Sequence, residues 1–410
     1  MNKHVLFISY DGMTDQLGTS QIIPYIIGLT KQGYSFTLLS CDKPDRLLKL
    51  RSYITEILSP YPIEWVPILY HKKPPVLSTL YDYWNLKRHA KKLHRKKPFD
   101  LVHTRSGVPS LVGLWLKKNL GIKFYNDVRG YYADDRVDGN MWSQKWLIYR
   151  MVYRFFKKHE LACFLKADVS SVLTYAARRD VQQWKNIPNQ PIPLEVIPCS
   201  ADVDFFNPTN INLSLKEKLR EELGIKKDEF IVSYLGSVGG WYMTGEMIHF
   251  CKVLYEKKPG TRFLFISPQP HSLILELAAK YGLPEESLIL RQGLRHEIPA
   301  LLSFSSYSLF FIKACYSKIA ASPTKHGEIM AMGIPVITNS GVGDVKEIVE
   351  KYKGGFVINQ LTAEAFNATA EQIAAGYNFD PKLIRKGAIE FYSLDNALAK
   401  YTANYNKLFA

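Results

Sequence analysis

The stretch SPTKHGEIMAMGIPVITNSGVGD, residues 322–344, has the pattern of a helix followed at once by a strand and a glycine-containing turn. Ser322 is a good helix cap and Pro323 suits the first helical position, because it gives up no hydrogen bond there. Gly333 is a typical helix stop. Residues 336–338 (VIT) are β-branched and favour a strand. The stretch therefore predicts one unit of an open parallel sheet with helices on its faces.

The first turn of this helix has the features of an anion site. Thr324 and Lys325 lie at its start, where free N–H groups, the helix dipole and a lysine charge all attract phosphate. Glu328 follows one turn later on the same side. A carboxylate repels phosphate but accepts hydrogen bonds from a sugar diol. The local sequence is compatible with a nucleotide site and equally with a capped helix that carries a surface Lys–Glu pair.

The rest of the chain repeats the alternation of strand and helix, which is typical of parallel sheets. Thirteen strands exceed one ordinary open sheet, so two doubly wound domains are expected. The predicted strands are residues 4–10, 36–41, 64–69, 101–105, 123–128, 168–174, 194–198, 230–236, 262–267, 287–291, 307–312, 335–338 and 355–358.

The domain boundary is expected near IPCSADVDFFNP, residues 197–208. We assign residues 1–200 to an N-terminal domain and residues 201–392 to a C-terminal domain. Residues 393–410 form an amphipathic helix whose apolar stripe must be buried, and the pattern alone allows it to pack on either domain.

Composition narrows the class of protein. The 410 residues contain 47% hydrophobic and 22% charged residues, as in globular proteins, and no apolar run approaches the length of a membrane span. The start of the chain lacks the pattern of a signal peptide. Five scattered cysteines without a CxxC pair favour free thiols in the cytoplasm and argue against a zinc site or a disulfide framework.

The net charge of +15 is concentrated in the first half of the chain, which indicates an acidic partner. Two segments carry much of it, NLKRHAKKLHRKKP at residues 85–98 and WLIYRMVYRFFKK at residues 146–158. The second reads as a basic amphipathic helix suited to an anionic membrane surface. A core-facing helix with a basic, solvated edge explains it equally well. No zinc-finger, RNP or KH pattern supports a nucleic-acid partner.

Polar or glycine-rich loops follow several predicted strands, where ligands of open α/β sheets bind. In the first half these include the loop containing Gly18, the strand end with His103 and Arg105, and the polar loop containing Asp127 and Arg129. In the second half, residues 236–240 (GSVGG) follow a strand and allow phosphate to approach the backbone.

The chain resembles the retaining glycosyltransferases of family 4, which have the GT-B fold. It resembles a variant of that family with an SPTK motif. The resemblance covers the whole chain in order and rests on five stretches. They are DGMTDQLGTSQ (11–21), LVHTRS (101–106), VIPCSADVDFFNP (196–208), YLGSVGGWY (234–242) and SPTKHGEIMAMGIPVITN (322–339). It implies an α/β architecture of two Rossmann-like domains facing a cleft, the second binding a nucleotide-sugar and the first an acceptor. It also implies that the last helix crosses back to the first domain.

The resemblance assigns roles in the second domain. Glu328 matches the glutamate that binds the ribose hydroxyls, and Lys325 with Thr324 would meet the diphosphate. Gly236 and Ser237 match the loop near the donor phosphates.

In the first domain, Gly18 matches the glycine that approaches the diphosphate. His103 matches a strand-end histidine near the reacting sugar, so the candidate catalytic residues are His103 together with Lys325 and Glu328. Asp127 and Arg129 fall in a loop that usually faces the acceptor.

Two positions depart from the family pattern. Counting eight residues back from Glu328, where many members have a first glutamate, gives Ala320. The glycine loop GGWYMTGE also lacks the basic residues that many members carry there, a charge that Lys325 could supply instead. Both departures concern how the leaving phosphate is stabilised.

The sequence therefore predicts a transferase that moves a sugar from a UDP- or GDP-sugar to a glycan or lipid-linked acceptor of a surface polysaccharide, such as lipopolysaccharide, capsule or exopolysaccharide. No cofactor or metal is expected, because the donor half has no DxD-type cluster. We expect a cytoplasmic protein, peripheral on the inner face of the cell membrane. Two alternatives stay open, a nucleotide-sugar 2-epimerase of the same fold and a non-catalytic, membrane-associated subunit that binds nucleotide-sugar.

Overall fold

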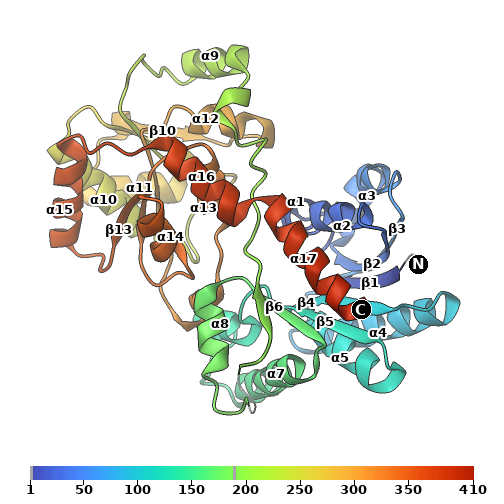
Figure 1. Cartoon of the computed structure of the whole chain (residues 1–410). Coiled ribbons are helices and arrows are strands. Elements are labelled where there is room, and N and C mark those ends of the chain that lie inside the picture. The colour runs from blue at the N-terminus through green and yellow to red at the C-terminus, as the bar shows by residue number, and fades with distance from the viewer. Residues whose placement is uncertain (1–2, 188–190) are drawn as a thin grey trace. The chain divides into compact units, whose positions relative to one another are not determined.

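The computed structural model describes residues 3–187 and 191–410 and divides into two compact units (Figure 1). Unit 1 comprises Met1–Pro198 together with Ala397–Ala410, and unit 2 comprises Cys199–Asn396. The sequence-based division placed the boundaries at residues 200 and 392. None of the helices in the described ranges is both long and apolar enough to span a membrane.

Unit 1 is built on a seven-stranded parallel sheet with the order β3-β2-β1-β4-β5-β6-β7. Its central strands are buried over most of their length because helices cover both faces of the sheet. The strands are β1 (Lys3–Ser9), β2 (Tyr34–Asp42), β3 (Ile63–Leu69), β4 (Leu101–Arg105), β5 (Lys123–Asp127), β6 (Val169–Val172) and β7 (Leu194–Val196).

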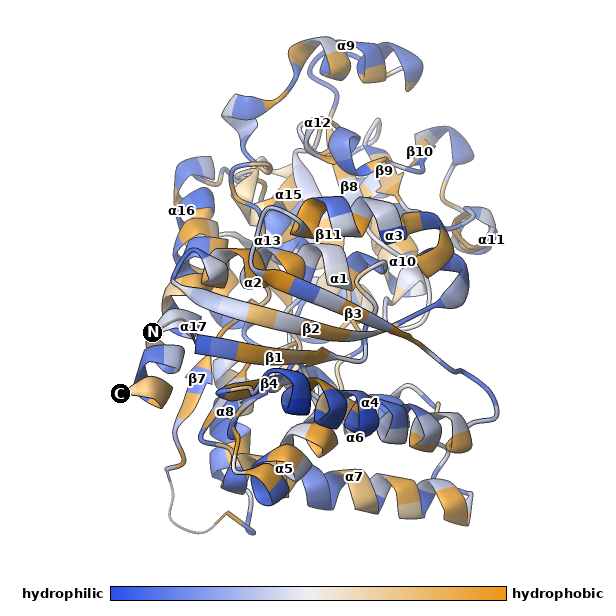
Figure 2. Ribbon diagram, turned by 90° about the vertical axis from the view of Figure 1, so that its right-hand side faces the viewer, coloured by the Kyte–Doolittle hydropathy of each residue, from blue (hydrophilic) through white to orange (hydrophobic). Residues whose placement is uncertain are grey.

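The helices of unit 1 lie on the two faces of this sheet according to the direction of the crossover. Crossovers from β1 toward β3 place α1, α2 and α3 on one face, and those from β3 toward β6 place α4, α5 and α7 on the other (Figure 2). The helices are α1 (Gln16–Gln21), α2 (Ile23–Thr30), α3 (Pro44–Leu58), α4 (Leu77–Lys96), α5 (Val108–Leu120), α6 (Tyr132–Asp138), α7 (Leu147–Lys166) and α8 (Tyr175–Gln182).

The last helix, α17 (Leu394–Phe409), packs on the α2 side of this sheet. A Cβ atom at Gly28 of α2 would lie 2.4 Å from a methyl carbon of Leu398, so a glycine is needed for this close approach. The rings of Tyr25 and Tyr401 also meet, with centroids 5.6 Å apart. The apolar stripe predicted for the C-terminal helix is buried against unit 1.

Unit 2 contains a six-stranded parallel sheet with the order β10-β9-β8-β11-β12-β13. One large core of apolar side chains surrounds it. The strands are β8 (Ile231–Leu235), β9 (Arg262–Ile266), β10 (Leu288–Arg291), β11 (Tyr307–Phe310), β12 (Val336–Asn339) and β13 (Gly355–Ile358).

The helices of unit 2 alternate with these strands, and several of the connections contain short 3-10 turns. The α-helices are α9 (Leu213–Glu222), α10 (Thr244–Lys257), α11 (Ser272–Tyr281), α12 (Ile298–Leu302), α13 (Thr324–Ala331), α14 (Val345–Lys351), α15 (Ala363–Ala374) and α16 (Pro381–Tyr392). The 3-10 turns are η1 (Pro208–Asn210), η2 (Glu285–Ser287), η3 (Arg295–Glu297) and η4 (Tyr316–Ala320).

All thirteen predicted strands are present, and the two doubly wound α/β units confirm the predicted fold class. The strand order reverses between β1 and β4 in unit 1 and between β8 and β11 in unit 2. Ligands of open α/β sheets bind beyond the carboxyl ends of the strands at such switch points. The loops after these four strands are therefore the first places to look for a site.

Candidate active site

Lys325 lies in the first turn of α13, and its side chain is buried beside the loop that follows β8. Its Nζ atom lies 3.7 Å from the ring centroid of Tyr242 and 4.6 Å from that of Tyr234. A Cβ atom at Gly236 would lie 2.5 Å from this nitrogen, so a side chain at residue 236 would displace the amine from this position. Burial lowers the pKa of Lys325 to about 7, although the nearby Glu328 carboxylate acts in the opposite direction.

The start of α13 differs from the prediction in one respect. The helix begins at Thr324, and Ser322 does not cap it. The Ser322 hydroxyl instead accepts a hydrogen bond from the backbone N–H of Cys199, at 3.2 Å, because that segment of unit 2 passes beside it. None of the described side chains caps α13. An uncapped helix start next to a buried amine is a suitable environment for an anion.

Glu328 lies one turn further along α13 and is paired with Arg295 of η3. The Arg295 Nη1 atom donates to Glu328 Oε1 at 2.7 Å. The Glu328 side chain is 11% exposed and that of Arg295 is 52% exposed, so a half-exposed guanidinium holds a nearly buried carboxylate. Sequence reasoning missed Arg295, because it lies 33 residues upstream in a short turn that carries no motif.

Backbone hydrogen bonds join the loops after β8 and β11 at the switch point. The N–H of Lys313 donates to the carbonyl of Trp241 at 2.9 Å, and that of Met243 donates to the carbonyl of Phe311 at 3.0 Å. Lys318 of η4 reaches back, with its Nζ atom 3.4 Å from the ring centroid of Trp241. The glycine loop therefore has two buried lysines beside it, Lys318 and Lys325, although it contains none itself.

Gly236 and Ser237 turn the chain directly after β8. Gly236 has a φ angle of 130°, which a side chain rarely allows. The carbonyl of Ser237 accepts a hydrogen bond from the Tyr234 hydroxyl. The position of the missing first glutamate, Ala320, is buried at the end of η4. The structure thus gathers Gly236, Ser237 and Lys325 at one switch point, with Glu328 one turn deeper in α13.

In unit 1, the loop after β1 is held by a carboxylate that sequence reasoning missed. Asp42, at the end of β2, accepts from the Thr14 N–H at 3.0 Å and from the Thr14 hydroxyl at 2.9 Å. Gly18 in α1 touches this loop so closely that a Cβ atom would lie 2.3 Å from the carbonyl oxygen of Gly12. Close packing thus explains why residue 18 is a glycine. The approach of Gly18 to a diphosphate stays a prediction.

His103 lies in the strand predicted for residues 101–105, but in its middle and not at its last residue. It is the third of the five residues of β4, and its ring is buried between the sheet and α17. Its Nδ1 atom lies 2.7 Å from the hydroxyl of Tyr405, and its ring stacks on Tyr125 with centroids 4.5 Å apart. Burial lowers the pKa of His103, while Asp127 acts in the opposite direction. A catalytic role for His103 stays a prediction, and these contacts favour a structural one.

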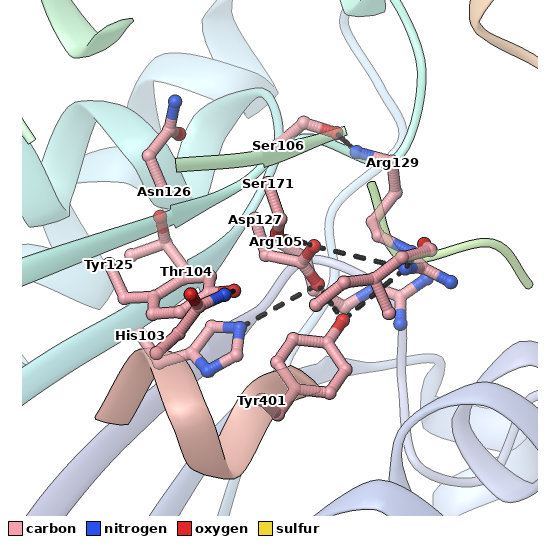
Figure 3. Close-up of polar contacts among 12 residues, drawn as sticks. His103, Thr104, Arg105, Ser106, Tyr125, Asn126, Asp127, Arg129, Ser171 and Tyr401 are labelled. Carbon is pink, nitrogen blue, oxygen red and sulfur yellow. Dashed lines mark hydrogen bonds and ion pairs between the residues drawn. The ribbon is translucent and has the colours of Figure 1, made fainter. Parts of the chain in front are cut away.

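Asp127 and Arg129 also contact α17, as Figure 3 shows. The Asp127 carboxylate accepts hydrogen bonds from Tyr401 at 2.9 Å and from Ser171 at 2.7 Å. The Arg129 guanidinium donates to the carbonyl of Ile197 at 3.1 Å and to the Tyr401 hydroxyl at 3.3 Å. Both side chains are almost fully buried. Their predicted contact with an acceptor is untested, and the bonds present anchor the C-terminal helix.

The charges around Asp127 keep it ionised. Burial by itself raises the pKa of Asp127, but Arg129 and His103 outweigh burial, so the pKa lies well below its ordinary value. Tyr401 lies 274 residues away in the sequence, and no local pattern around residue 127 indicated it. Within residues 3–187 and 191–410, no group of three or more His, Cys, Asp or Glu side chains is arranged to hold a metal ion.

Comparison with known proteins agrees with this geometry. A model described as Glycosyltransferase Family 4 matches residues 25–205, and one described as Glycosyl transferases group 1 matches residues 216–388. A search of curated proteins gives no significant match.

Solved structures with the same fold span the whole chain. Sucrose-phosphate synthase from Thermosynechococcus elongatus has 16% identity and a TM-score of 0.73, with 100% of this chain and 99% of that chain covered. Anabaena Alr3699/HepE in complex with UDP-glucose has 12% identity and a TM-score of 0.70, with coverage of 98% and 99%. WaaG, a glycosyltransferase involved in lipopolysaccharide biosynthesis, has 15% identity and a TM-score of 0.68, with coverage of 98% and 99%.

At these identities the structural matches establish the fold, and the two family models establish the kind of protein. The models leave only short stretches of the chain unmatched, and they follow each other in the order of the two units. The chain is therefore a glycosyltransferase with the GT-B fold, in which a family 4 glycosyltransferase region precedes a group 1 glycosyl transferase region.

Proposed function

We propose that this glycosyltransferase is retaining and metal-independent, and that it transfers a sugar from a UDP- or GDP-sugar to a glycan or lipid-linked acceptor. The observation that carries the proposal is the buried amine of Lys325 at the uncapped start of α13, directly beside Gly236. Burial favours the neutral form of this amine, and an anion beside it would offset the cost of burying its charge. A diphosphate bound at the helix start and the glycine loop would supply that anion.

Glu328 supports a nucleotide donor over a simple phosphate. Its carboxylate accepts hydrogen bonds and lies one turn deeper than Lys325, where the two ribose hydroxyls of a nucleotide could donate to it. Arg295 would hold the carboxylate in place without entering the phosphate site. HepE, which has the same fold, was solved with UDP-glucose, and this makes uridine nucleotides the first donors to test.

The reaction would proceed on one face of the sugar. The bond between the anomeric carbon and the diphosphate oxygen breaks, and a bond from that carbon to the acceptor oxygen forms on the same side. The acceptor proton passes to the departing diphosphate. Lys325 and the N-terminus of α13 would stabilise the negative charge on the diphosphate as it leaves, and this assistance requires no metal.

The charge of the chain supports our proposals for the acceptor and the cellular location. Its net charge of +15 favours an acceptor displayed on an anionic surface, as on a lipid-linked glycan. WaaG, of the same fold, is involved in lipopolysaccharide biosynthesis, and we infer a comparable role in surface polysaccharide assembly. All five cysteines are free thiols, which fits a cytoplasmic protein peripheral on the inner membrane face.

Thermal melting with UDP, GDP, ADP and their sugars tests the donor site directly. A ligand at about 100 times its dissociation constant adds about 2.7 kcal/mol to the free energy of unfolding. We expect one base to raise the melting temperature, and Glu328→Ala to reduce that shift. If no nucleotide shifts the wild-type protein, the proposed donor site is wrong.

The chemistry needs a second experiment. NMR of the product formed with the selected donor and a glycan acceptor should show the anomeric configuration of the donor, with turnover unchanged by EDTA. An inverted product or a covalent sugar–enzyme adduct would contradict the proposed mechanism. Release of a free epimer without acceptor would identify a 2-epimerase instead.

A further inference from the structure

Two helices of unit 1 present apolar side chains to solvent in their first halves. The spacing of three or four residues places three of these side chains in one stripe on each helix. Each is between 46% and 66% exposed, well above what a core-facing helix would show. We call these six residues the apolar ridge: Leu77, Tyr81 and Trp84 on α4, and Leu147, Met151 and Phe155 on α7.

Both halves of the ridge lie at the carboxyl edge of the sheet. Helices that connect parallel strands run opposite to them, so α4 and α7 both begin at that edge. Hydrogen bonds confirm the position. Asp82 of α4 accepts from the hydroxyl of Tyr10, which follows β1, and Tyr153 of α7 donates to Asp134, which follows β5. Figure 2 shows both helices on the same side of the sheet.

Basic side chains continue each stripe. On α4, exposed Arg88 and Arg95 follow Trp84 at helical spacing, and on α7 exposed Arg150 and Arg154 alternate with the apolar residues. An apolar strip bordered by exposed cations matches the layers of an anionic bilayer, in which apolar chains lie beneath negatively charged headgroups.

The alternative explanation, a core-facing α7 with a basic edge, accounts for only part of the helix. Phe156 is buried against the unit 1 core, as that explanation requires. Lys157, one of the basic residues of this helix, pairs with Asp134 at 2.8 Å and with Glu160 at 2.6 Å and is only 24% exposed. One side of α7 thus packs on the core of unit 1, and Leu147 and Met151 on the outer side of the helix are exposed.

We propose that the apolar ridge and its basic border dock unit 1 on an anionic lipid bilayer. This inference deepens the proposed function and rests on it for the lipid-linked acceptor. Docking through the first turns of α4 and α7 brings the carboxyl edge of the unit 1 sheet to the membrane surface. That edge includes the β1 and β4 loops at the switch point, so an acceptor anchored in the bilayer would reach it without leaving the membrane.

Vesicle co-sedimentation of the full chain tests the proposal. The probes are phosphatidylcholine vesicles with and without about one-third phosphatidylglycerol, at low and high salt. We expect binding to the anionic vesicles that weakens with salt. Trp84→Glu combined with Met151→Glu should lower the partition coefficient more than about tenfold, since it places charge in the apolar layer. Arg150→Gln with Arg154→Gln should lower it about fivefold per charge removed.

A matched control separates docking from net charge. Leu48 of α3 and Leu213 of α9 are 88% and 72% exposed but lie outside the ridge. The pair Leu48→Glu and Leu213→Glu adds the same two charges, and we expect binding to change less than about twofold. The proposal is wrong if the control variant loses as much vesicle binding as the ridge variant, or if the wild-type protein does not bind anionic vesicles. A wild-type dimer that the ridge variant dissociates would also overturn it, because a second copy would then cover the ridge.

Nucleotide melting shifts on the same variants keep the two proposals apart. The ridge variant should retain the wild-type shift, which also shows that it is folded. Vesicle binding without any nucleotide shift would contradict the donor site and leave the docking surface standing. A nucleotide shift without vesicle binding would contradict the docking surface and leave the donor site standing.

Discussion

The Lys325 amine lies 3.7 Å from the ring centroid of Tyr242, buried at the start of α13. A buried lysine is costly to protonate, and this one has a pKa of about 7 because of its burial. An aromatic ring stabilises the cation in part, but no ring replaces an anion. The site is thus poised to take up a proton when a negatively charged ligand arrives.

Proton uptake on donor binding is the first prediction. A nucleotide-sugar diphosphate should raise the pKa of Lys325, so binding takes up about 0.9 proton at pH 8, about 0.5 at pH 7 and about 0.1 at pH 6. Isothermal titration calorimetry in buffers of different ionisation enthalpy measures this number. Lys325→Met should abolish the uptake and weaken binding. Binding heats that do not depend on the buffer at pH 8 would refute the prediction.

Glu328 should act on the ribose, and ligand analogues can show it. Glu328→Gln is expected to weaken binding of a ribonucleotide about tenfold or more, as for hydrogen bonds to a charged group. The same substitution should have little effect on a 2′,3′-dideoxynucleotide, which has no diol to donate. A mutant–ligand cycle measured by calorimetry isolates this coupling. Equal losses for both ligands would show that Glu328 does not contact the diol.

Arg295 is expected to position Glu328 without touching the ligand. Arg295→Met should therefore reduce ribonucleotide affinity less than Glu328→Gln does, and show the same diol dependence. Its effect on stability should stay below about 1 kcal/mol, because the guanidinium is half exposed. A larger loss of affinity than in Glu328→Gln would mean that Arg295 binds the donor itself.

The hydrogen bond of Tyr401 should stabilise the packing of α17 more than the hydrogen bond between Tyr34 of β2 and Asn406 near the end of that helix. Tyr401→Phe removes the hydrogen bond to buried Asp127 and is expected to cost about 1–3 kcal/mol of unfolding free energy. Tyr34→Phe is the matched control, because it removes a hydrogen bond to Asn406, which is exposed near the end of α17. That change should cost no more than about 1 kcal/mol. Urea unfolding measures both, and a smaller loss for Tyr401→Phe would contradict the assignment.

His326 should make the protein sensitive to acid. Burial lowers its pKa from 6.5 to about 3, and its Nδ1 atom lies 2.9 Å from the Tyr392 hydroxyl. The unfolded chain therefore binds the proton first, and stability present above pH 6.5 is lost as the pH falls toward 3. The stability difference between wild type and His326→Gln should shrink by about 1.4 kcal/mol per pH unit below 6.5. A constant difference from pH 7 to pH 4.5 would contradict this.

Short-range patterns in the sequence were sufficient to predict the architecture and two residues of the site. Strand, helix and turn signals depend on neighbouring residues, so all thirteen strands could be predicted, together with the stop of α13 at Gly333. The placement of Lys325 and Glu328 on one helix followed from the same short-range periodicity. The prediction that Ser322 caps α13 was wrong, because the Ser322 hydroxyl accepts a hydrogen bond from the backbone N–H of Cys199, more than a hundred residues upstream.

Contacts between side chains that are far apart in the sequence could be identified only in the folded chain. Arg295 reaches Glu328 across 33 residues, and Tyr401 reaches Asp127 across 274. His103 looked like a strand-end residue, but α17 covers it through Tyr405. Crossover connections and the final helix bring these residues together, and neither leaves a periodic signal in the sequence near the residues concerned. Hydrophobic patterning predicts that one face of a helix or strand is buried, but it does not predict which other element covers that face.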